Sequence, residues 1–159
     1  MIEKLAILGT VGAGVAIGLL WPTAHRASTS AAPAAVELVI PRSDDHHYYA
    51  DAEVNGRSLH MMVDTGASET ALTEADARQI GIPLDPNKYE VIGDGASGMV
   101  RGQYVQLQSI DLGGIRQQDV KAVVVPGASV SLLGQPFLEK IDEIAIRKGE
   151  MRLKMDGRG

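Results

Sequence analysis

The sequence predicts a small, mostly β, barrel-like domain with one or two short helices, preceded by an N-terminal transmembrane helix. Three observations predict it. From residue 47 onward, runs rich in Val, Ile and Leu alternate with turns that contain glycine. Helical patterns are confined to two short segments, and Leu5 to Trp21 carries no charged residue. We therefore expect an anchor at 1–21, a flexible linker at 22–35 and one folded domain at 36–159.

The apolar segment is nearly long enough to cross a bilayer. As a helix, its rise of 1.5 Å per residue gives roughly 25 Å, against ~30 Å for the hydrocarbon core. Trp21 suits the interface, and Pro22 ends the helix. A cleaved signal peptide is the alternative, because the small residues of 31–35 offer cleavage-like sites. The Ala, Ser, Thr and Pro of the linker cannot bury a core, so it is expected to act as a tether.

Composition excludes several functions. A formal net charge of −5 provides no basic surface for a nucleic acid. The chain has no cysteine, so disulfides and thiolate chemistry are excluded. Adjacent His46 and His47 would point to opposite faces of a strand, so we expect no metal site. No Gly-x-Ser-x-Gly motif indicates a serine hydrolase, and His60 is expected to be a surface residue of a strand. We expect no cofactor.

The first predicted hairpin ends directly before a candidate catalytic carboxylate, that of Asp64. Strands at 47–54 and 58–63 flank Asn55-Gly56, whose residues both accept positive φ. The second strand ends at Asp64-Thr65-Gly66-Ala67. Gly66 and Thr65 favour a tight turn that could hold the Asp64 carboxylate by backbone N–H groups. The same triplet can also be an ordinary turn with a solvated aspartate.

The remaining elements follow from local signals. Thr73, with Asp76 three residues later, predicts a helix start, and the helix is expected to run through Ile80 and stop at Gly81. Beyond Leu84, β patterns cover four ranges, at 89–92, 99–110, 115–125 and 130–133, with a turn at Gly113-Gly114. A short helix at 136–141 precedes a last hairpin, 144–147 with 151–155, around Lys148-Gly149.

Three motifs in order carry a family resemblance. They are Asp64-Thr65-Gly66-Ala67, the glycine-rich hairpin Gly93 to Gly102, and Leu132-Leu133-Gly134 before a short helix. From Tyr48 to Met155 the chain resembles the retropepsin-like aspartic proteases, most closely their single-domain, membrane-anchored bacterial branch. The resemblance implies a single-lobe acid protease barrel over 36–159. It also implies that Leu132 and Leu133 pack under Asp64, and that Gly134 permits close backbone approach.

The resemblance implies a dimer. Aspartic proteases use two carboxylates that share a proton, whereas this chain has one Asp-Thr-Gly triplet. A two-fold homodimer would bring Asp64 from both protomers to the axis, with Thr65 bonded across it. Catalytic roles are thus expected for Asp64, Thr65 and Gly66. The hairpin would form a flap over a peptide bound as an added strand, with these substrate-binding residues: Ala67, Gly93, Asp94, Gly95, Ala96, Ser97 and Gly98.

The sequence therefore predicts a membrane-anchored aspartic endopeptidase. We expect a single-pass protein of the bacterial inner membrane, with the protease domain in the periplasm. Charges on the two sides of the anchor nearly balance, so they do not fix the orientation. The alternative is a membrane-tethered module of the same fold that binds or assembles peptides without cleaving them. Gln135-Pro136, where a less rigid continuation is expected, keeps that alternative open.

Overall fold

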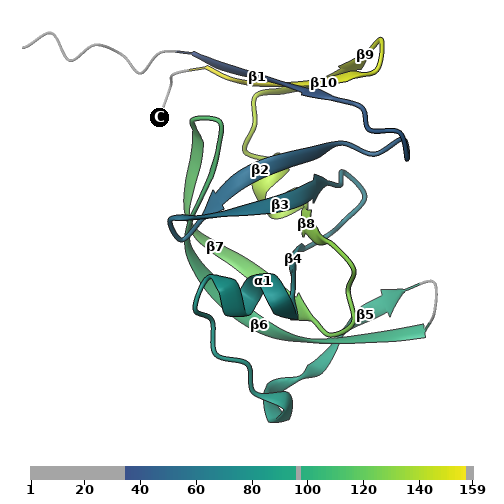
Figure 1. Cartoon of the computed structure of the whole chain (residues 1–159), viewed down its shortest axis with the longest axis vertical. Coiled ribbons are helices and arrows are strands. Elements are labelled where there is room, and N and C mark those ends of the chain that lie inside the picture. The colour runs from purple at the N-terminus through teal and green to yellow at the C-terminus, as the bar shows by residue number, and fades with distance from the viewer. Residues whose placement is uncertain (1–34, 96–97, 157–159) are drawn as a thin grey trace, which may run out of the picture. The chain divides into compact units, whose positions relative to one another are not determined.

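A computed structural model describes residues 35–95 and 98–156 of this chain (Figure 1). The expected anchor at 1–21 and nearly all of the linker at 22–35 lie outside the described residues. Within the described ranges, no helix has the length and apolar character needed to cross a membrane.

The described chain is mainly β, with two short α-helices. Its strands are β1 (Val36–Pro41), β2 (Tyr49–Val54), β3 (Arg57–Val63), β4 (Thr70–Thr73), β5 (Glu90–Gly95), β6 (Gly98–Leu112), β7 (Ile115–Val125), β8 (Ser131–Leu133), β9 (Glu143–Arg147) and β10 (Glu150–Met155). Its helices are α1 (Glu74–Gln79), α2 (Gln135–Leu138) and the 3₁₀ turn η1 (Pro86–Lys88). The predicted fold class, a mainly β domain with short helices, is confirmed.

Six strands close into a barrel. They are hydrogen-bonded in the order β2-β3-β8-β4-β7-β6, and β2 also pairs with β6 through Glu53 with Asp111 and Val54 with Ile110. Strand β5 adds a hairpin to the outer edge of β6. Two pairs inside the barrel, β3 with β8 and β4 with β7, are parallel. These parallel pairs join segments far apart in sequence, which places β8 beside the end of β3.

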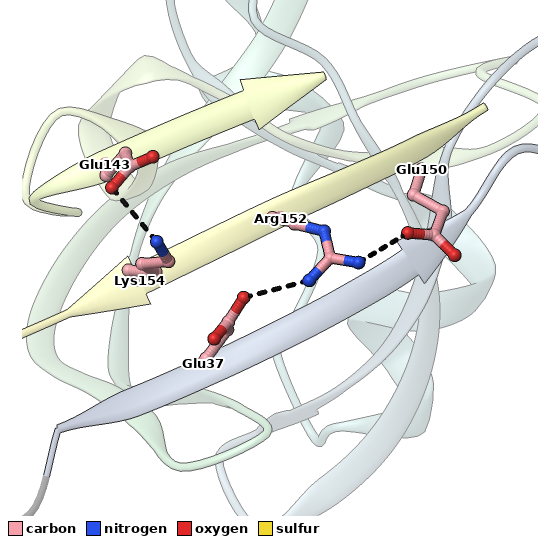
Figure 2. Close-up of polar contacts among 5 residues, drawn as sticks. All are labelled: Glu37, Glu143, Glu150, Arg152 and Lys154. Atoms are coloured by element: carbon pink, nitrogen blue, oxygen red, sulfur yellow. Dashed lines mark hydrogen bonds and ion pairs between the residues drawn. The ribbon is translucent and has the colours of Figure 1, made fainter. Parts of the chain in front are cut away.

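A separate three-stranded sheet contains both ends of the folded domain, in the order β1-β10-β9 (Figure 1). One face is apolar and contributes Ile40, Met151 and Leu153 to the core. The other face is charged. There Arg152 lies between two glutamates, with its Nη1 3.2 Å from Glu37 Oε1 and its Nη2 2.8 Å from Glu150 Oε2 (Figure 2). Lys154 forms an ion pair with Glu143 on the same face. These two carboxylates, Glu150 first and then Glu37, raise the pKa of Arg152 above its usual range.

Three predicted tight turns are confirmed by left-handed backbone. Asn55-Gly56 has φ of 49° and 76°, Gly113-Gly114 has 61° and 94°, and Lys148-Gly149 has 52° and 81°. Two successive positive φ values belong to the turn type that matches the twist of a β-hairpin. The glycines accept this conformation without a Cβ clash, so each turn fixes the register of its two strands.

The helix predicted after Thr73 is also confirmed. Thr73 Oγ1 accepts a hydrogen bond from the Asp76 amide (3.0 Å), and Gly81, at φ 81°, follows the last turn. Helix α2 covers 135–138, so it begins one residue before the predicted range and ends three residues earlier. Strands β1 and β4 have no counterpart among the predicted elements. β4 is buried at all four positions, so it lacks the alternation that reveals a half-buried strand.

Candidate active site

The Asp64 carboxylate sits on a turn at the end of β3. Its Oδ1 accepts a hydrogen bond from the Gly66 amide at 2.9 Å, and its carbonyl accepts one from the Ala67 amide at 3.2 Å. Thr65 and Gly66 are exposed, whereas Asp64 and Ala67 are partly buried. The turn therefore presents the carboxylate at the surface of the domain and fixes one of its oxygens.

Strand β8 holds this turn from beneath. The Asp64 amide donates to the Leu133 carbonyl (3.1 Å), directly after the parallel pairs Met62 with Leu132 and Val63 with Leu133. Leu133 is fully buried, whereas Leu132 is partly buried and also pairs with Ala71 of β4. Because β8 bonds to β3 on one side and β4 on the other, the position of Asp64 is tied to the barrel.

Gly134 leaves room for no side chain. A Cβ built there would lie 2.8 Å from the Ala67 carbonyl oxygen and would also overlap the Glu69 carbonyl. Such separations are shorter than real Cβ contacts, and both obstacles are backbone atoms. Glycine at this position is therefore required by the close approach of two chain segments, and not by its φ angle.

Gln135 is a residue of this site that the sequence did not identify. Its amide donates to the Ala67 carbonyl (2.9 Å), and its side-chain Nε2 donates to the Thr65 carbonyl (2.6 Å). The side-chain bond joins residues 70 positions apart, so no local pattern could reveal it. The adjacent Pro136 was noted in the sequence as an unexpected rigid residue, and it lies in the first turn of α2.

The start of α1 is tied to β8 through a buried hydroxyl. Ser131 Oγ accepts from the Thr73 amide (3.0 Å) and donates to Asp76 Oδ2 (2.5 Å). In a capping box the third residue of the helix would bond directly to the amide of the cap. Here Ser131 relays that bond, which links the helix to the strand beneath the Asp64 turn.

The β5–β6 hairpin and the loop after β7 line an open groove of about 790 Å³. Most of the described residues that line it are apolar; they are Pro86, Tyr89, Gly98, Met99, Val100, Arg101, Val125, Pro126, Gly127 and Ala128. Met99 is 75% exposed, and the Arg101 guanidinium donates to the Tyr89 carbonyl (2.5 Å). Arg101 is the cationic side chain among the lining residues that the structure describes, and none of those described residues is acidic.

Only some of the residues expected to bind substrate lie at this groove. Gly98 lines it, and Gly93, Asp94 and Gly95 lie in the β5 strand of the same hairpin. Ala96 and Ser97, at the hairpin tip, lie outside the described residues. Ala67 lies on the turn with Asp64, and neither of these two residues lines the groove. The described chain therefore presents the carboxylate turn and the groove as two separate surfaces.

A cluster of polar side chains lies on the first hairpin and the loop before it. His60 Nδ1 lies 2.8 Å from Asp51 Oδ1, and the His60 ring stacks on Tyr49 with 5.3 Å between centroids. Tyr49 in turn donates its hydroxyl to Asp45 (2.7 Å). His60 is thus the surface strand residue that was predicted. Among the described residues, no group of three or more His, Asp or Glu side chains could hold a metal ion.

Residues 50–140 match the family described as "gag-polyprotein putative aspartyl protease". An uncharacterized protein of a Sinorhizobium species is 34% identical over 74% of this chain, and one of Rickettsia prowazekii is 37% identical over 70%. The chain spans about half the length of these curated relatives, 52% and 48%.

Two solved structures are also similar. A crystal structure of a retropepsin-like aspartic protease from Rickettsia conorii has a TM-score of 0.63 at 32% identity, with 76% of this chain and 90% of that chain covered. EIAV protease, in complex with the inhibitor HBY-793, has a TM-score of 0.50 at 19% identity, covering 61% of this chain and 89% of that one. The second likeness concerns the fold alone. The matched family model, together with the Rickettsia conorii structure, shows that this chain belongs to the retropepsin-like aspartic protease family.

Proposed function

We propose that this protein is an aspartic endopeptidase whose catalytic carboxylates are the Asp64 residues of two protomers. The observation that carries the proposal is the Asp64 turn. One carboxylate oxygen is fixed by the Gly66 amide, and the turn is pinned to β8, in a chain of an aspartic protease family. Since the Asp-Thr-Gly triplet occurs once in the chain, a second protomer must supply the second carboxylate.

The chemistry of the proposed dyad follows from two carboxylates that share one proton. The ionised carboxylate takes a proton from water, whose oxygen attacks the carbonyl carbon of the scissile peptide bond. The protonated carboxyl gives its proton to the carbonyl oxygen, which forms a neutral diol. When the C–N bond breaks, the leaving nitrogen takes up a proton from the dyad, and one hydroxyl of the diol gives its proton back to the dyad as the carboxylic acid forms. One water is consumed, and the dyad returns to its starting state.

The groove supports a peptide with apolar side chains as substrate. Apolar surface is offered by Met99, Val100, Val125 and Pro126. The positive charge of Arg101 would repel a basic side chain of the substrate. In the proposed dimer, the β5–β6 hairpin of each protomer closes over a peptide that lies as an added strand across the two Asp64 turns. Thr65, exposed on its turn, would contact the turn of the partner.

We also propose that residues 1–21 anchor the protein in the bacterial inner membrane and that the domain faces the periplasm. The supporting observation is the uncharged run Leu5 to Trp21. Confinement to a membrane would raise the local concentration of protomers and so favour pairing.

The test is peptide hydrolysis by the full chain in detergent. Asp64→Asn should abolish hydrolysis of a mixed peptide library, because an amide keeps the shape but cannot share a proton. Asp44→Asn removes an equal charge from an exposed loop and serves as the control, which should stay active. Specific activity should rise with protein concentration. The concentration at which it reaches half of its maximum should equal the midpoint of the monomer–dimer equilibrium. An inactive wild-type dimer that still binds peptides would favour the non-catalytic module, and an active Asp64→Asn variant would refute the assignment.

A further inference from the structure

We propose that Gln135 is a positioning residue that locks the Asp64–Ala67 turn, and thereby sets the geometry of the catalytic carboxylate. Its effect on catalysis rests on the proposed function; its effect on the turn does not. Gln135 donates to two carbonyls of the turn, through Nε2 to Thr65 (2.6 Å) and through its backbone amide to Ala67 (2.9 Å). One residue thus holds the turn at two points.

The residue is itself firmly held. Phe137 and Leu138 of α2 are buried in the core, and Gln117 Nε2 of β7 donates to the Phe137 carbonyl (2.6 Å). Pro136 restricts the backbone immediately after Gln135, because its ring fixes φ near the value of a helix start. The side chain of Gln135 therefore extends from a rigid base, which lowers the entropy lost when its amide bonds to Thr65.

The contact between the Gln135 side chain and the Thr65 carbonyl requires that Gln135 donate the hydrogen bond. A backbone carbonyl only accepts hydrogen bonds, so the –NH₂ end of the Gln135 amide must face Thr65. Thr65 lies between Asp64 and Gly66, and Gly66 is the residue whose amide fixes Asp64 Oδ1. Rotation of the peptide unit between Thr65 and Gly66 would move this amide away from the carboxylate. The Gln135 bond opposes that rotation because it holds the carbonyl of the same peptide unit.

The structure offers a matched control. Gln79, at the end of α1, is also exposed, and its Nε2 donates to a backbone carbonyl, that of Ser58, at 3.0 Å. The variants Gln135→Ala and Gln79→Ala each remove one exposed amide-to-carbonyl bond and keep the backbone. Only the first loosens the Asp64 turn, so any difference between them reports on position and not on the loss of a glutamine.

The first measurement is amide hydrogen exchange of the full chain in detergent. Gln135→Ala should speed exchange at Gly66 and Ala67 by about fivefold, the size expected for loss of one net hydrogen bond. Gln79→Ala should leave both amides unchanged. Unchanged exchange in Gln135→Ala would overturn the proposal. This readout does not depend on peptidase activity, so an inactive wild type would contradict the proposed function without affecting the test of the turn.

The second measurement separates positioning from simple structural support. Gln135→Ala should lower kcat by about fivefold with little change in KM, because the reacting carboxylate is misplaced while the groove is intact. Gln135→Glu adds a pH readout. Its carboxyl can donate to Thr65 when protonated, but when ionised it has no proton to offer that carbonyl oxygen. The ionised form also adds a negative charge to a region that carries Asp64 and Glu69 on the bonded segment and Glu139, whose amide bonds to the Gln135 carbonyl.

The activity of Gln135→Glu relative to wild type should therefore fall as pH rises through the range where a glutamate ionises. The same ratio for Gln135→Ala should stay flat over that range, since alanine has no titratable group. A flat ratio for Gln135→Glu, or equal losses of activity in Gln135→Ala and Gln79→Ala, would show that Gln135 does not position the turn.

Discussion

The Asp64 amide donates to the carbonyl of Leu133, 3.1 Å away, directly beyond the last parallel pair of β3 and β8. Through this bond the candidate catalytic turn continues the strand pairing of the barrel, although the two residues lie in distant parts of the sequence. The geometry of the turn therefore depends on how closely the segment after Leu133 can approach it. Gly134 and Ser131, on either side of the Leu132-Leu133 pair, are the positions at which this dependence can be tested.

Gly134→Ala should destabilise the domain strongly. The added Cβ would lie 2.8 Å from the Ala67 carbonyl oxygen, and a backbone atom cannot rotate away as a side chain would. We expect a loss of about 3 kcal/mol in the free energy of unfolding, as for severe overpacking. Urea titration at fixed protein concentration measures it. Gly93→Ala is the control, since a Cβ there meets nothing within 4 Å; equal stability of the two variants would contradict the close approach.

Ser131→Ala should cost about 2 kcal/mol in the free energy of unfolding, because it leaves the buried Thr73 amide without an acceptor. The same urea titration measures this loss. A double-mutant cycle with Asp76→Asn then isolates the hydroxyl-to-carboxylate bond. The two losses should fall short of additivity, since Ser131 and Asp76 belong to one network. Strict additivity would mean that the hydroxyl does not couple α1 to β8.

Arg101→Glu should change which peptides are cleaved. Arg101 is the cationic side chain among the described residues that line the groove, so under the proposed function the wild type should discriminate against Lys and Arg at one substrate position. The variant should improve kcat/KM for such peptides by about fivefold, which corresponds to ~1 kcal/mol. Competition between paired peptides measures the shift. Arg116→Glu, at a different pocket, should leave the preference unchanged; if it shifts preference equally, the effect is one of net charge.

Tyr49→Phe should raise the pKa of Asp45. In the folded protein, the His47 amide and then the Tyr49 hydroxyl hold that pKa below its usual range by bonding to the ionised carboxylate. Removal of the hydroxyl leaves the amide, so the pKa should rise only part of the way. NMR titration of the Asp45 side chain measures it. Tyr48→Phe is the control, and an unmoved Asp45 pKa in Tyr49→Phe would contradict the bond.

The same shift fixes the sign of a pH effect on stability. Because the folded pKa lies below the unfolded one, ionised Asp45 favours folding above the unfolded value. The contribution disappears as pH falls through the lowered folded value. Tyr49→Phe should therefore lose slightly less stability than wild type on acidification over this range. Asp45 is exposed, so the effect is expected to be small.

Local chemistry allowed much of the fold to be predicted. Asn55-Gly56, Gly113-Gly114 and Lys148-Gly149 predicted hairpins because positive φ depends on the turn residues themselves. Thr73 predicted a helix start because its hydroxyl bonds only three residues ahead. Strand β4 was missed because it is wholly buried and its partners, such as Leu132, are distant in sequence. For the same reason the sequence could indicate Asp64 but not Gln135, whose side-chain role depends on a carbonyl 70 residues away.

Val36 pairs with Met155 in the β1–β10 sheet, so the folded domain begins and ends at the same place. A short peptide should therefore be able to join these two points without distorting either strand. New ends could then be opened at the exposed Gly113-Gly114 turn, where the backbone is already left-handed. A circular permutant of this kind should keep the barrel and the Asp64 turn, while the proposed membrane tether would be attached to β6 or β7 instead of β1. Such a protein would show whether the direction from which the domain is held matters to its activity.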